Sequence, residues 1–256
     1  MKILIITDIH YGEDTNYPGQ NGENYINSFG SQFENFLPKI HSLINEHDLV
    51  INLGDLIHDT TAESDVIEYK KAMELFGHEK PIKHVFGNHD LNNLSRDQLA
   101  EITGEEKSYY SFDLGRCHHI VLCGFRNSRA ELVKIDEEQI AWLQQDLDKT
   151  NLSTIVYCHY PLDEQSTVNN YYFKDRPERA FIENRVIIRS VIESSKKVLA
   201  VFNGHLHFFN QEAIHGILYV TAPAFTENNG KHEPQAECLS VSLEDSNVHI
   251  LLKNLA

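Results

Sequence analysis

Five short apolar segments, each ending in polar residues, constrain the fold of this chain more than any other feature. The segments are rich in Val, Ile and Leu and are bounded by Gly, Asp, Asn or His, so they read as buried β-strands. They cover residues 2–7, 48–54, 82–87, 153–159 and 198–204. Segments that favour helices lie between them, at residues 31–46, 62–76, 95–102, 136–148 and 177–193. This alternation predicts βαβ units with parallel strands in a mixed α/β fold.

The pattern changes after residue 106. Residues 107–115 and 118–124 predict an antiparallel pair of strands that turns at Gly115 and Arg116. The helix over 136–148 begins with Asp136 as its N-cap and carries a Glu at the capping-box position. Several short strands follow residue 204. We therefore expect a parallel part followed by a more antiparallel part, with helices covering the sheets.

Carboxylate, amide and imidazole side chains stand at the carboxyl ends of the predicted strands. These residues are Asp8, His10, Asp55, Asn88, His89, Asp90, His159, His205 and His207. In an open α/β sheet this end of the strands is where ligands bind. Residues i and i+2 of an extended chain point to the same side, so we expect each Asp-x-His or His-x-His pair to face one point. Glycines 54, 87 and 204 allow close approach of the backbone at the same turns.

The donor set indicates a metal site. Imidazole, carboxylate and amide groups suit Mn²⁺, Fe²⁺ or Zn²⁺, and no thiolate is needed. Counted together, these side chains exceed the number that one ion normally takes from a protein. The sequence therefore predicts two ions with one carboxylate between them.

Composition argues against several other classes of protein. The formal net charge of −16 disfavours nucleic acid as a partner, because binding to nucleic acid depends on neutralising phosphates. No apolar run is long enough for a signal peptide or a membrane span. The four cysteines form no close pair and read as reduced thiols. We expect a cytoplasmic protein that does not bind membranes.

The motifs follow one another as DIH (8–10), GD (54–55), GNHD (87–90), a lone His after a strand (159) and GHLH (204–207). In this order they resemble the calcineurin-like metallophosphoesterase superfamily. The resemblance implies a four-layer α-β-β-α sandwich of two mixed β-sheets flanked by helices, formed as a single domain over residues 1–256. It also implies a hydrolase with two divalent metal ions, which are manganese, iron (Fe²⁺/Fe³⁺) or zinc.

The resemblance also assigns roles to individual residues. One metal would be held by Asp8, His10, Asp55 and His207. The other would be held by Asp55, Asn88, His159 and His205, with Asp55 bridging. A hydroxide shared by the metals would attack phosphorus in line. His89 would assist the leaving group, with Asp90 orienting or charging it.

A local resemblance suggests the substrate. GNHDLNNLSR (87–96) followed by SYYSFDLG (108–115) is similar to the manganese-dependent ADP-ribose/CDP-alcohol diphosphatase branch. That branch has Glu where this chain has Asp90, and an aromatic sequence where it has residues 92–94. The resemblance implies a small phosphorylated or nucleotide-type substrate with a phosphodiester or diphosphate bond. The alternatives are a class III cyclic-nucleotide phosphodiesterase or a broad phosphomonoesterase; a DNA nuclease and a non-catalytic scaffold are disfavoured by the charge and by the complete ligand set.

Several loop residues have two interpretations. Aromatic residues in segments 11–30 and 160–180 either stack on a nucleobase or anchor the loops: Tyr11, Tyr17, Tyr25, Tyr160, Tyr171, Tyr172 and Phe173. Arg96 or Lys174 is a candidate to meet a second phosphate. Purple acid phosphatases, which resemble this chain in the same motifs, have a Tyr where this chain has His58, which argues against iron–tyrosinate chemistry. Asp59 is a candidate partner for nearby groups.

Overall fold

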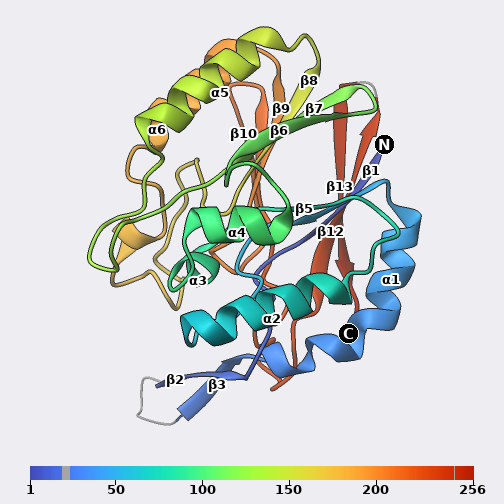
Figure 1. The fold of residues 1–256 in the computed structure, drawn as a ribbon, viewed down its shortest axis with the longest axis vertical. Helices are drawn as coiled ribbons and strands as arrows, with labels where there is room; N and C mark the ends of the chain where they lie inside the picture. Colours follow the sequence, from blue (N-terminus) through green and yellow to red (C-terminus); the bar gives the residue numbers. More distant parts are fainter. Residues whose placement is uncertain (19–23, 245) are drawn as a thin grey trace.

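The computed structural model describes residues 1–18, 24–244 and 246–256, and within them two β-sheets pack face to face (Figure 1). The first sheet has the strand order β13-β12-β1-β4-β5. Strands β1 (Lys2–Ile6), β4 (Leu49–Asn52) and β5 (Ile82–His84) run parallel. Strands β12 (Glu237–Glu244) and β13 (Asn247–Asn254) extend the sheet in antiparallel fashion from β1.

The second sheet has the strand order β10-β11-β9-β8-β7-β6. Its inner strands, all parallel, are β7 (Cys117–Leu122), β8 (Ser153–Cys158), β9 (Val198–Asn203) and β11 (Ile217–Thr221). Its antiparallel edge strands are β6 (Tyr110–Leu114) and β10 (Asn210–Ile214). The expectation of a more antiparallel second part is therefore wrong for the centre of this sheet, because the helices of the second half connect parallel strands as those of the first half do.

Helices cover the outer face of each sheet (Figure 1). The first sheet is covered by the 3₁₀ helix η1 (Gly30–Phe36), α1 (Leu37–Glu46) and α2 (Ala62–Leu75). The second is covered by α5 (Glu137–Lys149) and α6 (Arg185–Ser195). Short helices α3 (Asn88–Leu91), α4 (Arg96–Thr103) and η2 (Pro177–Arg179) lie in connections. The predicted α-β-β-α sandwich is confirmed.

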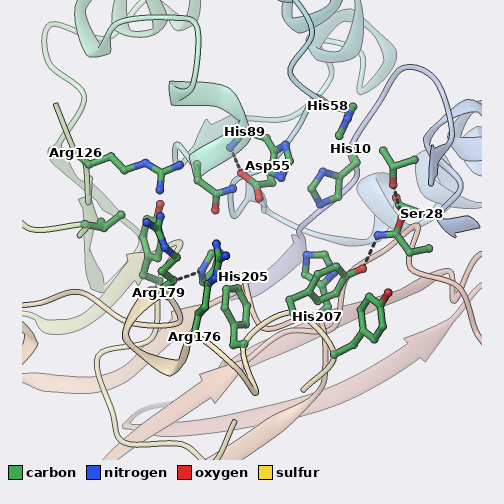
Figure 2. Close-up of a pocket in the computed structure, with 18 of the residues that line it drawn as sticks. His10, Ser28, Asp55, His58, His89, Arg126, Arg176, Arg179, His205 and His207 are labelled. Carbon is green, nitrogen blue, oxygen red and sulfur yellow. Dashed lines mark hydrogen bonds between the residues drawn. The ribbon is translucent and has the colours of Figure 1, made fainter. Parts of the chain in front are cut away.

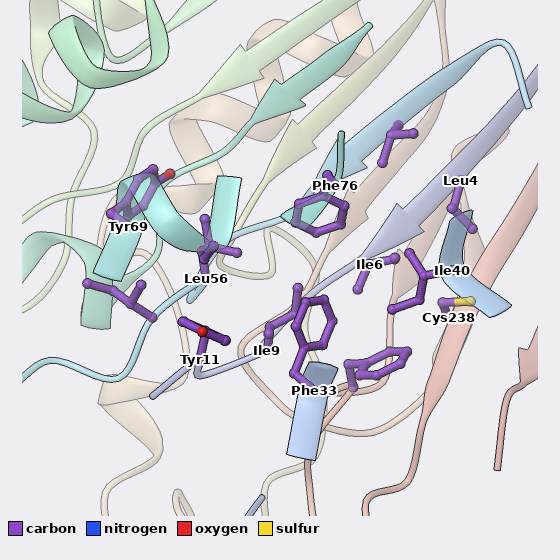
Figure 3. Close-up of a cluster of buried hydrophobic side chains, with 14 of the residues drawn as sticks. Leu4, Ile6, Ile9, Tyr11, Phe33, Ile40, Leu56, Tyr69, Phe76 and Cys238 are labelled. Carbon is purple, nitrogen blue, oxygen red and sulfur yellow. The ribbon is translucent and has the colours of Figure 1, made fainter. Parts of the chain in front are cut away.

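Strand β1 shows why the sequence forms these layers. It is buried on both faces, and its side chains alternate between two apolar clusters. Ile3 and Ile5 pack between the sheets, whereas Leu4 and Ile6 pack toward the helices. Figure 3 shows this outer cluster, in which Leu4 and Ile6 lie near Ile40 of α1.

Two predicted helices begin later than expected. Residues 31–36 form the 3₁₀ helix η1, and α1 starts beside Pro38, a residue that fits the first turn of an α-helix. Residues 177–179 form only η2, and α6 starts at Arg185. At the N-cap of α6, the Asn184 side chain bonds the backbone N–H and C=O of Ile135 and so ties the start of this helix to a neighbouring loop.

The N-terminus of α5 and the segment 11–30 differ in part from the sequence predictions. Asp136 caps α5 as predicted, but the residue at the capping-box position is Gln139 rather than Glu, and its side chain bonds the backbone of Cys123. Segment 11–30, which was expected to be a loop, contains an antiparallel pair of strands, β2 (Thr15–Pro18) and β3 (Asn24–Ser28). The side chain of Tyr17 lies outside the described residues.

Among the described helices, none has the length and apolar character needed to cross a membrane.

Candidate metal centre

The polar residues that follow the parallel strands come together at one end of both sheets. The register of β1, β4 and β5 puts their carboxyl ends at one edge, and the same holds for β8 and β9. The residues that follow these ends are Asp8, His10, Asp55, Asn88, His89, His159, His205 and His207. Most of them line one cavity of about 620 Å³ (Figure 2), while Asp8 and His159 lie fully buried behind it. The structure thus brings together all seven predicted metal ligands.

A left-handed backbone conformation recurs in this cluster. The φ angle lies between 47° and 67° at Asp8, His10, Asp55, His205 and His207. Each such residue costs about 1–3 kcal/mol and persists only where its surroundings fix it. Hydrogen bonds from Asp8 N to Gly54 O and from His10 N to Asp55 O, both 3.0 Å long, help to fix it here. The expected extended spacing is therefore the wrong reason for the convergence of these pairs.

Glycines make room for the cluster, as the sequence predicts. A Cβ atom at Gly54 would overlap the imidazole of His159, and Gly54 itself has a φ of +103°. A Cβ atom at Gly87 would overlap the carboxylate of Asp55. The backbone of the turns can therefore approach the buried side chains only without a side chain of its own.

The donor atoms form two groups. In the first, Asp8 Oδ1 lies 3.1 Å from His207 Nε2, and the His10 ring lies 5.4 Å from that of His207. In the second, Asp55 Oδ2 lies 3.3 Å from His159 Nε2, and the His205 ring lies 5.1 Å from that of His159. Within each group, one donor atom per residue falls within 4.8 Å of the others, which is close enough for each group to hold one metal ion.

Many of these donor atoms are buried and unpaired. Asn88 Oδ1 and both ring nitrogens of His10 have no hydrogen-bond partner within the described chain, whereas Asp8 Oδ1 and His159 Nε2 face other candidate ligands, His207 and Asp55. Buried polar atoms in folded proteins nearly always have a partner. A concentration of buried imidazole, carboxylate and amide donor atoms without partners outside the cluster fits a pair of divalent cations.

Outer partners orient the imidazoles. His159 Nδ1 lies 2.9 Å from the carbonyl oxygen of Leu53, and His207 Nδ1 lies 2.6 Å from Glu227 Oε2. A partner on one ring nitrogen leaves the other, Nε2, directed at the metal position. Sequence reasoning missed Glu227 because it lies 20 residues beyond His207 and belongs to no motif.

Both carboxylates of the centre stay ionised. Burial would raise the pKa of Asp8, but the imidazoles of His207 and His159 hold it below its usual value. Burial would also raise the pKa of Asp55, yet His159 and His89 hold it well below 3.8. Hydrogen bonds support the same state, since Asp8 Oδ2 accepts from Thr7 Oγ1 at 2.6 Å and Asp55 Oδ1 accepts from His89 N at 2.7 Å.

The carboxylate that pairs with His89 is Asp59. His89 Nδ1 lies 2.6 Å from Asp59 Oδ1, and Asp59 is also bound by Asn92 Nδ2 at 3.0 Å and by Arg129 Nη2 at 2.6 Å. Burial alone would lower the pKa of His89, but the charges of Asp55 and Asp59 raise it.

The expectation that Asp90 orients His89 has to be corrected. Asp90 is fully buried, and its carboxylate accepts hydrogen bonds from the backbone N–H groups of Leu56, Ile57 and Gly87. These bonds hold the strand-end turns of β4 and β5 together. Asp90 therefore supports the backbone that carries Asp55 and Asn88.

His58 lines the cavity beside the first ligand group. Its ring lies 5.1 Å from that of His89 and 6.1 Å from that of His10. Burial lowers its pKa, which favours a neutral ring. These three histidines form a further group whose nitrogens lie within 4.8 Å of one another.

Several aromatic residues of the 160–180 segment anchor the loop on the centre. Tyr160 and Phe173 pack on the His205 ring at 4.5 and 4.7 Å, and Tyr172 packs on the His207 ring at 4.9 Å. Tyr11 belongs to the core. Of the two cations suggested for a second phosphate, Lys174 lines the cavity, whereas Arg96 pairs with Asp136 and stacks on Phe125.

Comparison with known proteins agrees with this geometry. The family model described as "Calcineurin-like phosphoesterase" matches residues 1–209. A dimetal phosphatase from Danio rerio is similar in structure, with a TM-score of 0.73 and 15% identity, covering 100% of this chain and 96% of that one.

Two further solved structures share the fold. The purple acid phosphatase PPD1 from yellow lupin has a TM-score of 0.65 and 14% identity, covering 99% of this chain and 51% of that one. A phosphopantetheinyl hydrolase from Mycobacterium tuberculosis has a TM-score of 0.57 and 15% identity, covering 87% and 89%. No curated protein sequence matches the chain. Because the family model spans most of its length, this chain belongs to the calcineurin-like phosphoesterase family and is a phosphoesterase with a candidate dimetal centre.

Proposed function

We propose that this protein hydrolyses phosphodiester or diphosphate bonds in small nucleotide-type substrates with two divalent metal ions. The observation that carries the proposal is the pair of donor groups, each able to hold a metal, at the floor of one cavity. The cavity volume of about 620 Å³ suits a ligand of nucleotide size, since such pockets span about 300–1,000 Å³.

We assign the ligands from the two donor groups. Asp8, His10, Asp55 and His207 would hold one ion. Asp55, Asn88, His159 and His205 would hold the other, so the Asp55 carboxylate would be shared. Manganese, iron and zinc all fit this donor set. When bound, such a pair of ions supplies a nucleophile at neutral pH and neutralises charge on the phosphoryl oxygens.

His89 acts on the leaving group in this proposal. Its Nδ1 is taken by Asp59, which leaves Nε2 to give a proton to the departing oxygen. Asp59 positions the ring and keeps the proton on the correct nitrogen, as the orienting carboxylate does in other catalytic dyads. The ring lies at the cavity wall, within reach of a substrate bound above the metals.

A metal and substrate panel tests the proposal. Metal-depleted protein would be reloaded with Mn²⁺, Fe²⁺ or Zn²⁺ and assayed on bis(p-nitrophenyl) phosphate, cyclic AMP, p-nitrophenyl phosphate, ADP-ribose and CDP-choline. The proposal expects metal-dependent turnover that is highest on the nucleotide diphosphates. Preference for cyclic AMP would favour a cyclic-nucleotide phosphodiesterase, and preference for the monoester would favour a phosphomonoesterase. As a control for the assay, His78→Gln changes an exposed histidine outside the cavity and should show the same metal and substrate preferences as the wild type.

A further inference from the structure

We infer that Arg126, Arg176 and Arg179 form a subsite for a second phosphate group of the substrate. We call these three residues the arginine wall. The inference rests on the proposed function and deepens it, because it selects the P–O–P linkage of a diphosphate as the bond that is cleaved. The wall was not among the residues that the sequence motifs indicate, since it lies on loops away from every strand-end motif.

The arginine wall belongs to the same cavity as the metal centre. Arg126 comes from the loop after β7, and Arg176 and Arg179 come from the loop between β8 and α6. Figure 2 shows the three labelled arginines on one side of the pocket, with Ser28 and His58 on the other. Two loops distant in sequence therefore place guanidinium groups against one side of one cavity.

None of the three forms an ion pair with a carboxylate in the described residues. Arg126 Nη2 donates to Asn92 Oδ1 at 3.0 Å, and Arg179 Nη1 donates to the carbonyl oxygen of Arg129 at 3.1 Å. Among the hydrogen bonds of the described residues, these leave most N–H donors of the Arg126 and Arg179 guanidinium groups unused. By contrast, Arg96, Arg129, Arg185 and Arg189 are all paired with carboxylates.

Among the described residues the exposed Arg116 also lacks an ion pair, but a shortage of acidic residues does not explain the unpaired wall. The sequence has 38 Asp and Glu against 22 Lys and Arg, so carboxylate partners are abundant. Two of them, Glu131 and Asp175, line the same cavity, and the Glu131 carboxylate accepts from Asn127. A local group of cations in a negatively charged protein concentrates anionic ligands at the site.

The arginine wall borders the leaving-group side of the centre. His205 Nε2 lies 3.1 Å from the carbonyl oxygen of Arg179. Arg126 is linked through Asn92 to Asp59, the partner of His89. A group held by the wall therefore lies beside the side chain that we place at the departing oxygen.

The chemistry of arginine selects phosphate as the ligand. The planar guanidinium matches phosphate oxygens in a bidentate manner, better than a point charge does. With a diphosphate, the attacked phosphorus would face the candidate metal ligands and the neighbouring phosphate would meet the wall. The oxygen of water forms the new P–O bond, and the bridging oxygen leaves with the second phosphate and its electron pair. The departing oxygen takes a proton from His89, one proton of the attacking water restores His89 and the other passes to solvent, so the products are two phosphate monoesters.

Substrate discrimination tests the inference. We would compare kcat/KM for CDP-choline with that for bis(p-nitrophenyl) phosphate, which has a single phosphate, in the Mn²⁺-loaded enzyme. Arg176→Gln and the Arg176→Gln/Arg179→Gln double variant should lower this ratio by about 10-fold or more, the usual effect of losing hydrogen bonds to a charged group. Arg116→Gln, at the exposed turn between β6 and β7, is the matched control and should leave the ratio unchanged.

A binding measurement gives a second readout that needs no turnover. Calorimetry would compare α,β-methylene-ADP, which cannot be hydrolysed between its phosphates, with AMP. The wild-type preference for the diphosphate should fall in the double variant by a similar factor. A double variant that keeps its melting temperature, the wild-type kcat/KM ratio and the wild-type binding preference would overturn the inference. If the wild type instead hydrolyses none of the substrates with any metal, the proposed function fails, while the binding comparison still decides whether the wall holds a second phosphate.

Discussion

The floor and the wall of the pocket are built in different ways. The floor is the set of seven candidate metal ligands at the strand ends, with mostly buried side chains and, at five of the seven, a left-handed backbone. The wall consists of long side chains, half-buried or exposed, on loops that follow β7 and β8. The difference teaches that the sheets fix the reaction chemistry, whereas loops fix the choice of substrate.

The largest effect should come from the residue shared by both halves of the floor. Asp55→Ala removes the proposed bridging ligand and leaves the neighbouring imidazoles without their carboxylate. We expect loss of both metals, measured by elemental analysis, and activity at the level of metal-free protein. Asp97→Asn, at an exposed aspartate of α4, should keep both metals and activity. A firmly bound pair of metals in the Asp55 variant would show that the floor does not depend on this residue.

Changing His89 should separate chemistry from metal binding. His89→Ala should keep the metals and lower kcat by about 10²–10⁴-fold, the usual contribution of a general acid. Asp59→Asn should cause a smaller loss of kcat with an altered pH profile, because it removes the orienting partner. Full activity of His89→Ala would exclude His89 from the mechanism.

Asp90 offers the contrasting result within the same motif. Asp90→Ala leaves three buried N–H groups without their acceptor, so it should lower stability by about 1–3 kcal/mol or more. Urea unfolding of the metal-free protein would measure this loss. Asp59→Asn should unfold close to the wild type. The reverse pattern would restore the original expectation for Asp90.

A smaller effect should follow at the outer partner of His207. Glu227→Gln keeps the size of the side chain but weakens its hold on the ring. We expect the affinity of one metal to fall by about 10–100-fold, as for other outer partners of metal ligands. Titration of metal-depleted protein with Mn²⁺ would measure it, with Glu212→Gln on the exposed edge strand β10 as the control. Unchanged affinity would mean that Glu227 only packs against the loop.

The smallest effect should lie outside the pocket and touch only stability. Burial alone would lower the pKa of His118, but hydrogen bonds to Asp146 and Asp113, 2.8 and 2.6 Å long, raise it above 6.5. Because the pKa of His118 is higher in the folded state, protonated His118 stabilises the fold. This contribution is fully present below pH 6.5 and is lost as pH rises through the folded-state pKa. The stability difference between wild type and His118→Gln should therefore shrink over that range, by under about 1 kcal/mol. A difference that does not vary with pH would contradict the assignment.

Sequence reasoning located the floor because strands and motifs coincide there. Asp8, Asp55, Asn88, His159 and His205 each follow a run of apolar residues, and parallel strands bring such positions to one edge. The alternation of strands and helices predicted the mixed α/β class, and the family resemblance implied the sandwich. The start of α6 could not be predicted, because it depends on the contact of Asn184 with a distant loop.

Features that depend on tertiary contacts escaped the sequence. The pairing of His89 with Asp59 rather than Asp90 depends on where the turn after β4 lies relative to α3. The left-handed backbone at the ligands has only a weak signal in residue type, since Asp and His adopt this conformation more often than most residues but far less readily than glycine. The arginine wall has no periodicity and comes from two separate loops. Such features emerge only when the chain is folded.

Crystals grown with Mn²⁺ and measured at the manganese absorption edge would test the central claim most directly. The account predicts two anomalous peaks about 3.5–4 Å apart, with the Asp55 carboxylate between them, one beside His207 and the other beside His205. A single peak, or peaks away from these side chains, would contradict it.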